Sequence, residues 1–203
     1  MKFNTQEIFD VLFKEKEVKV FMRRLDLISS PVSGNKYFKL KYNILKALEN
    51  KNDTIVTFGG AYSNHILATS IISKKENIKC IGYIRGEKTL PLNPTLNDAI
   101  NNGMQIRYIS RKEYKRINNE DYLNFLKQKH KNSYIIPEGG TNKLAVKGAE
   151  LIVNSDDNFQ FICCPIGTGG TISGIINSSS ENQQIIGFSS IKGVKKIIDD
   201  IDS

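Results

Sequence analysis

The residues most suited to chemistry in this 203-residue chain form a glycine-rich run directly after an apolar segment. Residues 161–166 are typical of a buried strand in a parallel sheet, and an apolar helical pattern follows Thr171. Gly167, Gly169 and Gly170 lie between the two. A strand that turns through glycines into a helix leaves backbone N–H groups free at the helix N-terminus, where the helix dipole adds positive charge. The run therefore predicts an anion site, and a phosphate is the natural occupant.

The alternative for this run is an ordinary glycine-rich turn with nothing bound, since glycine is also the default residue of tight turns. Two well-known phosphate loops do not match it. A P-loop needs a lysine after the last glycine, whereas Gly170 is followed by Thr171 and Ile172. The dinucleotide fingerprint needs a third glycine where Ile172 stands. A phosphate held here would therefore belong to a smaller ligand.

Two other apolar segments also end in glycine-rich turns followed by polar residues. These turns read GGAYSNH at 59–65 and EGGTN at 138–142. Ligands of open α/β sheets bind at the carboxyl ends of the strands. One such turn would be unremarkable, but we expect three of them to line one cleft.

The elements that must position these turns alternate along the chain. Apolar strand patterns are separated by helical ones, and Asn93-Pro94 forms a typical helix start. This alternation predicts an α/β fold with mainly parallel sheets. The expected strands are 18–22, 54–58, 79–84, 105–109, 134–136, 161–166 and 184–188. The expected helices with both ends defined are 6–14, 36–49, 62–75 and 141–153. Further helices are expected from residue 94, in one or two pieces up to residue 131, after residue 171, and as a charged terminal piece at 192–203.

Composition narrows the classes of partner. The net charge of +8 suits an anionic cofactor or substrate, and 39% hydrophobic with 25% charged residues is ordinary for a globular protein. Nucleic-acid binding is not expected, because no basic run interleaves with aromatic residues. The densest basic cluster, residues 111–116, contains Glu113 and is typical of a solvated helix face.

The three cysteines and the N-terminus bear on the compartment. Cys80, Cys163 and Cys164 lie in apolar strand patterns, and their odd number without paired spacing favours neither a disulfide framework nor a zinc site. No metal is expected. The first ten residues lack the apolar core of a signal peptide, and no run approaches transmembrane length. We expect a cytoplasmic protein without membrane contact.

Four motifs together resemble a known family. GNKYFKL at 34–40, GGAYSNH at 59–65, PEGGTN at 137–142 and GTGGT at 167–171 occur in the order found in fold-type II pyridoxal-phosphate (PLP) enzymes. Within them the chain is most similar to the D-cysteine desulfhydrase and 1-aminocyclopropane-1-carboxylate deaminase family. VFMRRLDL at 20–27 looks like the strand that precedes the lysine in these enzymes. The resemblance implies two three-layer α/β domains with mainly parallel sheets, like the tryptophan synthase β chain, and pyridoxal 5'-phosphate as cofactor.

The resemblance gives two lysines a role. Lys36 matches the lysine that forms the internal aldimine with PLP, which requires its pKa to fall from about 10.4. The alternative is that Lys36 is one of many solvated lysines. Lys39, one turn later on the same helical face, would add charge at the phosphate. Many relatives have arginine before this second lysine, where the chain has Phe38.

Three consecutive residues match the family around the cofactor ring. Asn64 matches the asparagine that donates a hydrogen bond to the ring hydroxyl oxygen, and Ser63 matches the serine that contacts the substrate carboxylate or assists proton transfer. The alternative for both is helix capping, which is compatible with function. His65 is expected among the substrate-binding residues, as a polar residue behind the substrate and not as the base. His130 is expected on the surface of a charged helix.

The remaining matches concern the phosphate and the substrate. Gly167, Thr168, Gly169, Gly170 and Thr171 match the phosphate-binding loop. Gly140 and Thr141, with Asn142, are expected to line the substrate side, although a purely structural turn is the alternative.

The resemblance also implies a reaction. An amino-acid substrate would displace Lys36 from the cofactor, the cofactor ring would accept the electrons of the broken bond, and Lys36 would move protons. The products would be a 2-oxo acid and ammonia. D-Cysteine would also release sulfide, and the cyclopropane amino acid would give 2-oxobutanoate. The expected class is a lyase or hydrolase of amino-acid metabolism.

The resemblance leaves one part of the family's chain without a counterpart. Nothing after Phe188 matches the later part that faces the cofactor ring nitrogen. We therefore expect a smaller α/β domain at 46–140 inside an incomplete larger PLP-binding domain, formed by 1–45 and 141–203. The exposed sheet edge would favour a homodimer. The alternative function is a shortened, catalytically impaired remnant that binds the cofactor or an amino acid.

Overall fold

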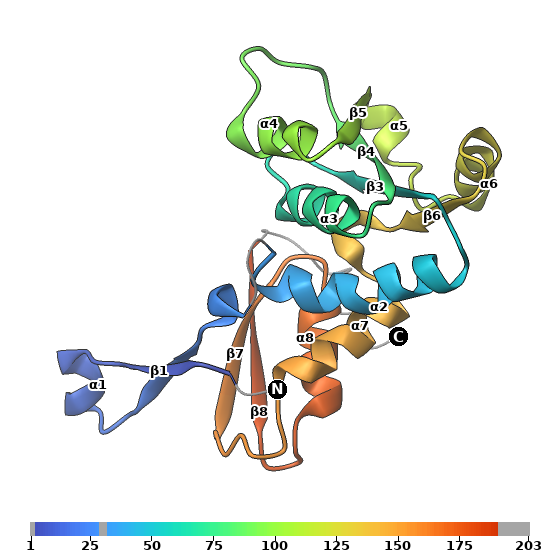
Figure 1. The fold of residues 1–203 in the computed structure, drawn as a ribbon. Coiled ribbons are helices and arrows are strands. Elements are labelled where there is room, and N and C mark those ends of the chain that lie inside the picture. Colours follow the sequence, from blue (N-terminus) through green and yellow to red (C-terminus); the bar gives the residue numbers. More distant parts are fainter. Residues whose placement is uncertain (1–2, 29–31, 191–203) are drawn as a thin grey trace.

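The computed structural model describes residues 3–28 and 32–190. The helical piece expected at 192–203 lies outside these residues. Within them, no helix is long and apolar enough to cross a membrane. The alternation predicted from the sequence is confirmed, since strands and helices follow one another in an α/β fold with mainly parallel sheets (Figure 1).

One region is built on a parallel sheet of four strands. The order in the sheet is β5-β4-β3-β6, and β3 pairs with β4 over its whole length and with β6 over residues 54–57. All six residues of β3 are buried, because helices cover both faces of the sheet (Figure 1). The strands are β3 (Thr54–Gly59), β4 (Lys79–Arg85), β5 (Met104–Ile109) and β6 (Ser133–Ile136).

Each face of this sheet has its own core. On one face, side chains of β3 such as Ile55 pack with Ile44, Ile66 and Leu96 from three helices. Those helices are α2 (Asn35–Glu49), α3 (Asn64–Lys75) and α4 (Pro94–Asn101), and Asn93 caps α4 as the sequence predicts. The other face packs against α5 (Arg111–Tyr114) and α6 (Glu120–Lys129).

A second region contains a two-stranded parallel sheet of β7 (Phe161–Ile166) and β8 (Gln184–Ser189). It packs against α7 (Lys143–Ala149), the 3-10 turn η3 (Glu150–Ile152) and α8 (Gly170–Ser178). The expectation that β7 is buried is wrong for one of its faces. Cys164 is buried against the helices, but Phe161 is 48% exposed. Successive side chains of a strand point to opposite faces, and only one face is covered here.

Helix α2 belongs to both regions. Its later residues, including Ile44, join the core of the four-stranded sheet, whereas Phe38 joins the core of α7, α8 and β7. The contact with α7 is close: a Cβ on Gly148 would lie 2.0 Å from the backbone oxygen of Phe38. The helix that carries both candidate lysines is therefore fixed between two cores (Figure 1).

The N-terminal segment differs from the sequence prediction. Instead of a helix at 6–14, the chain forms β1 (Thr5–Ile8), which pairs antiparallel with β2 (Val20–Arg23), and the short helix α1 (Val11–Glu15) between them. The helix begins later than predicted because Asp10 caps it, accepting a hydrogen bond from the backbone of Leu12. A short 3-10 turn, η1 (Leu25–Leu27), follows β2. The hairpin projects from the rest of the structure (Figure 1).

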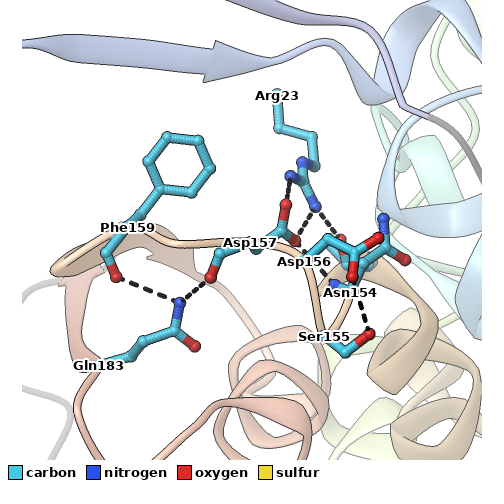
Figure 2. A network of polar contacts seen from close by, with 8 residues as sticks. Arg23, Asn154, Ser155, Asp156, Asp157, Phe159 and Gln183 are labelled. Atoms are coloured by element: carbon cyan, nitrogen blue, oxygen red, sulfur yellow. Dashed lines mark hydrogen bonds and ion pairs between the residues drawn. The ribbon is translucent and has the colours of Figure 1, made fainter.

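One ion pair ties the base of this hairpin to the loop before β7 (Figure 2). Both terminal nitrogens of Arg23 donate to the Asp157 carboxylate, and one of them also donates to the backbone oxygen of Ile152 at 2.6 Å. Gln183 holds the same loop from the other side by donating to the backbone oxygens of Asp157 and Phe159. We call the ion pair between Arg23 and Asp157 the Arg23–Asp157 clamp.

Candidate functional site

Three of the predicted turns meet in the structure beside the start of α2. They follow β3, β6 and β7, and the turn after β6 is the 3-10 helix η2 (Glu138–Gly140). Contacts between side chains from α2, from the segment after η2 and from the loop after β7 define a site that we call the cradle. Its central residues are Asn35, Lys39, Thr141, Thr168 and Thr171.

Lys39 lies at the centre of the cradle. Its side chain is only 1% exposed, and its ammonium group donates to the hydroxyl oxygens of Thr141 at 2.8 Å and Thr168 at 3.2 Å. Of the ion pairs found among the described residues, none includes Lys36 or Lys39. Within this part of the chain, the buried cation is therefore held by neutral hydroxyls and not by a carboxylate.

The absence of a counter-charge has an electrostatic consequence. Burial, and then the nearby charge of Lys36, lower the pKa of Lys39 to about 7. Burial also lowers the pKa of Lys36, whose side chain is half-buried one turn earlier on α2. An anion that entered the cradle would raise the pKa of Lys39, because an opposite charge nearby favours the charged form.

The N-terminus of α8 forms the floor of the cradle. Gly169 stands at the N-cap position, so no side chain caps the helix there. A Cβ on Gly170 would lie 3.1 Å from the Lys39 nitrogen and 3.0 Å from Thr141. Asn35 donates from its side-chain amide to the Thr171 hydroxyl at 2.9 Å and so joins the start of α2 to α8. Uncapped backbone N–H groups, hydroxyls and a buried cation are a suitable environment for a phosphate.

A pair of asparagine side chains, which the sequence did not predict, fixes the distance between α2 and the turn after β6. Asn142 donates to the Asn43 oxygen at 2.7 Å, and Asn43 donates back to the Asn142 oxygen at 3.1 Å. Asn43 also donates to the backbone oxygen of Lys39, and Asn142 caps α7 by accepting from Ala145. Asn142 therefore has a positioning role beside Thr141. Asparagine inside an otherwise amphipathic helix was the only sequence signal for Asn43.

Ser63 and Asn64 begin α3 after the turn that follows β3. Ser63 is the N-cap and accepts from the backbone of Ile66 at 3.3 Å, which is the capping role that the sequence left open for it. Asn64, the first residue of α3, has an exposed side chain. The Ser63 side chain is half-buried, so both residues are reached by solvent.

The two histidines have different surroundings. His65 is 1% exposed, with its Nε2 2.7 Å from the Thr57 hydroxyl of β3. His65 is therefore covered by β3 and η2 and does not lie open to a substrate. His130, expected on the surface of a charged helix, is the half-buried C-cap of α6, and its Nε2 lies 2.8 Å from the Tyr83 hydroxyl.

The structure thus brings Lys39, Thr141, Thr168, Gly170 and Thr171 together. Gly140 lies against His65, and a Cβ on it would be 3.2 Å from the imidazole ring. Thr57 and Asn43, both fully buried polar residues, are contributions that the sequence did not reveal. Among the described residues, no group of three or more His, Cys, Asp or Glu side chains could hold a metal ion.

Comparison with curated proteins finds relatives whose names describe the same type of enzyme. No family model matches the chain. A protein of Thermotoga maritima with the provisional name 1-aminocyclopropane-1-carboxylate deaminase is 35% identical over 77% of this chain and 52% of its own length. The bifunctional D-cysteine desulfhydrase/1-aminocyclopropane-1-carboxylate deaminase of Arabidopsis thaliana, a mitochondrial protein, is 34% identical over 77% of this chain and 44% of its own. The chain spans about half the length of the curated relatives it matches.

Comparison with solved structures finds a protein with a related name. The crystal structure of a homologue of 1-aminocyclopropane-1-carboxylate (ACC) deaminase matches the whole chain with a TM-score of 0.83 and 25% identity, and the match covers 64% of that protein. Maize serine racemase matches over 90% of this chain and 55% of its own, with a TM-score of 0.68 and 16% identity. At this identity, the second likeness supports the fold alone.

Proposed function

We propose a function from the premise that this chain is a homologue of the 1-aminocyclopropane-1-carboxylate deaminases and D-cysteine desulfhydrases and has the fold of fold-type II PLP enzymes. The proposed activity is PLP-dependent deamination of a small amino acid to a 2-oxo acid and ammonia. One observation carries the proposal: Lys39 is buried at the uncapped N-terminus of α8, and no carboxylate among the described residues pairs with it.

The residues of the cradle fit the cofactor. Its phosphate would lie against the backbone of residues 167–171 and the hydroxyls of Thr168 and Thr171, with Lys39 as its buried cation. Lys36, one turn earlier, would bond to the cofactor aldehyde, and its lowered pKa favours the neutral amine that this bond needs. Asn64 would donate to the ring hydroxyl oxygen. When bound, PLP supplies an electron sink for the bond broken at the substrate α-carbon.

The remaining chemistry belongs to side chains of the chain itself. Ser63 and the N-terminus of α3 would bind the substrate carboxylate, with Gly140 and Thr141 on the opposite side. Lys36, once displaced by the substrate amino group, would hold and transfer a proton. With one water, D-cysteine gives pyruvate, hydrogen sulfide and ammonia, and 1-aminocyclopropane-1-carboxylate gives 2-oxobutanoate and ammonia. The second conversion is classed as a hydrolase reaction.

Titration with PLP tests the proposal. Purified protein should develop the visible absorbance of lysine-bound PLP, and Lys36→Ala should abolish it. Lys41→Ala is the matched control, because Lys41 is an exposed lysine on the same helix. Protein that develops no such absorbance would contradict the proposed function. Product assays with D-cysteine and with the cyclopropane amino acid would then identify the substrate.

The second candidate function is binding of PLP or an amino acid without catalytic turnover. Visible absorbance without either 2-oxo acid product would favour this candidate. Full activity would exclude it.

Three accompanying properties are part of the same proposal. Residues 46–140 would form the smaller domain, which is supported by a four-stranded sheet that lies wholly within them. Residues 1–45 and 141–203 would form the larger PLP-binding domain.

The protein would act as a homodimer, which is supported by exposed apolar residues in the hairpin such as Phe9, whose side chain is 85% exposed. Its location would be cytoplasmic. Analytical ultracentrifugation and cell fractionation test the last two.

A further inference from the structure

The turn after β6 contacts the glycine-rich loop after β7 directly. A Cβ on Gly139 would lie 2.9 Å from the hydroxyl oxygen of Thr168, and the positive φ of Gly139, 64°, is a conformation that glycine adopts readily. Two residues later, the methyl carbon of Thr141 lies 3.0 Å from the position that a Cβ on Gly170 would occupy. Thr141, which the sequence led us to expect on the substrate side, thus lies against the N-terminus of α8.

The hydroxyl of Thr141 is part of a cluster of three polar groups. The Lys39 nitrogen lies 2.8 Å from the Thr141 oxygen and 3.2 Å from the Thr168 oxygen, and the two oxygens lie 2.5 Å from each other. Lys39 is only 1% exposed, whereas Thr141 is half-buried and Thr168 is exposed. The cluster therefore has a buried side, formed by the lysine, and an open side, formed by the hydroxyls.

The cluster has more protons than its own acceptors can use when Lys39 is charged. Each threonine hydroxyl has one proton and two lone pairs, and an ammonium group has three protons and no lone pair. Lys39 donates to both oxygens, and the contact between the oxygens uses one hydroxyl proton. The threonine that accepts this proton has then used both lone pairs, so its own proton must point out of the cluster. Whichever threonine accepts, one hydroxyl proton and the third N–H of Lys39 are left for a partner outside the cluster.

These outward donors favour an anionic oxygen over an ammonium group. The proposed reaction offers two such anions, the phosphate of PLP and the carboxylate of the amino acid. The carboxylate is proposed to lie at Ser63, and no hydrogen bond within residues 3–28 and 32–190 joins Ser63 to the cluster. Thr141 instead contacts Thr168 and lies beside Gly170, which both belong to the loop proposed for the phosphate. The position of Thr141 therefore favours the phosphate.

We propose that Thr141 belongs to the phosphate site and not to the substrate site: the Thr141–Thr168 pair, held by Lys39, donates one hydroxyl proton to a phosphate oxygen. Thr141 follows β6 and η2, and Thr168 follows β7, so a phosphate bound to the pair would join the four-stranded sheet to the second region. Gly140 keeps its place on the substrate side. The proposal deepens the proposed function and rests on it only for PLP as the carrier of the phosphate.

Inorganic phosphate tests this site without PLP. Urea unfolding at increasing phosphate concentration and constant ionic strength gives the phosphate affinity from the stabilisation that the anion causes. Thr141→Val keeps the shape of the side chain but removes the hydroxyl, so it should weaken phosphate binding by about tenfold. Thr141→Ser keeps the hydroxyl and should bind as the wild type does, and so should Thr89→Val at an exposed position. Equal affinity of Thr141→Val and wild type, or no stabilisation of the wild type by phosphate, would overturn the proposal.

Comparison of PLP with pyridoxal, which lacks the phosphate, separates the two anions. Thr141→Val should lower the affinity for PLP by about tenfold and leave the affinity for pyridoxal unchanged. An equal loss for pyridoxal would overturn the proposal. Unchanged PLP affinity with a raised KM for the amino acid would place Thr141 at the substrate and would also overturn it. Failure of both aldehydes to give the visible absorbance would contradict the proposed function, whereas the result with inorganic phosphate would stand.

Discussion

The cradle and the Arg23–Asp157 clamp solve the same electrostatic problem in opposite ways. Each removes a cation from water between segments that are distant in sequence. In the clamp, the Arg23 guanidinium meets a carboxylate that accepts from both of its terminal nitrogens (Figure 2). In the cradle, the Lys39 ammonium donates to two hydroxyls, and no carboxylate in residues 3–28 and 32–190 pairs with it.

The difference separates a structural contact from a binding site. Burial by itself would raise the pKa of Asp157, but hydrogen bonds from Arg23 and the Asn154 backbone and the charge of Arg23 hold it below its usual value. The clamp is therefore complete without a ligand. The cradle has an unbalanced positive charge, which costs stability until an anion enters. Each prediction below breaks one of the two.

The largest effect is expected for Lys39→Met. The substitution removes the buried cation while keeping a chain of similar size, so PLP affinity should fall by about 100-fold. Titration of the visible absorbance measures it. Lys41→Met, at an exposed position on the same helix, should leave affinity unchanged. Equal affinity of Lys39→Met and wild type would show that the phosphate lies elsewhere.

Disruption of the clamp should lower the stability of the protein and leave its affinity for PLP unchanged. Asp157→Asn leaves Arg23 without a charged partner, and the free energy of unfolding should fall by about 2 kcal/mol. Urea unfolding measures it. Asp156→Asn changes the neighbouring exposed carboxylate and is the matched control. Loss of PLP affinity in Asp157→Asn at unchanged stability would reverse the roles given to the two sites.

Both sites should make stability rise with pH, but in different pH ranges. The folded pKa of Lys39, about 7, lies below its unfolded value of 10.5, so the unfolded chain binds more protons between these values and stability rises with pH. From pH 7 to pH 9 the ligand-free protein should gain about 1–2 kcal/mol. Lys39→Met should reduce this gain, and the same gain in both proteins would contradict the assignment.

The clamp accounts for the acidic side of the same profile. The folded pKa of Asp157 lies below its unfolded value of 3.8, so its contribution is present above pH 3.8 and is lost as pH falls through the folded pKa. Asp157→Asn should therefore flatten the acid limb of the stability profile and leave the alkaline limb unchanged.

The smallest effect is expected for the asparagine pair. Asn142→Ser keeps a cap for α7 but removes the amide that pairs with Asn43, at an expected cost of about 1 kcal/mol. The looser contact between Lys39 and Thr141 should weaken PLP binding by a few-fold. Urea unfolding and PLP titration measure the two effects separately. Thr171, on the other side of the cradle, is held by Asn35 and should be unaffected.

The sequence was most informative where one chemical pattern repeats. Strand and helix alternation predicted the parallel sheet, and the glycine-rich turns predicted which segments would meet, because the carboxyl ends of parallel strands share one edge. The polar contacts behind the turns were not predictable. Thr57 reads as an ordinary strand residue and Asn43 as an ordinary helix residue, and only folding shows that each has a buried partner. The helix expected at 6–14 failed because pairing with β2 overrode local propensity.

The positions along the chain of the residues that meet in the cradle also predict an order of folding. Strands β3, β4 and β5 pair with their neighbours in the chain, so these closures are short, and β6 joins β3 across 79 positions. The cradle instead joins residues far apart in the chain: Asn35 and Thr171 are separated by 136 positions, and Lys39 and Thr168 by 129. Such closures carry a larger entropy cost, so we expect the cradle to form last. Recovery of PLP binding during refolding should lag behind recovery of secondary structure.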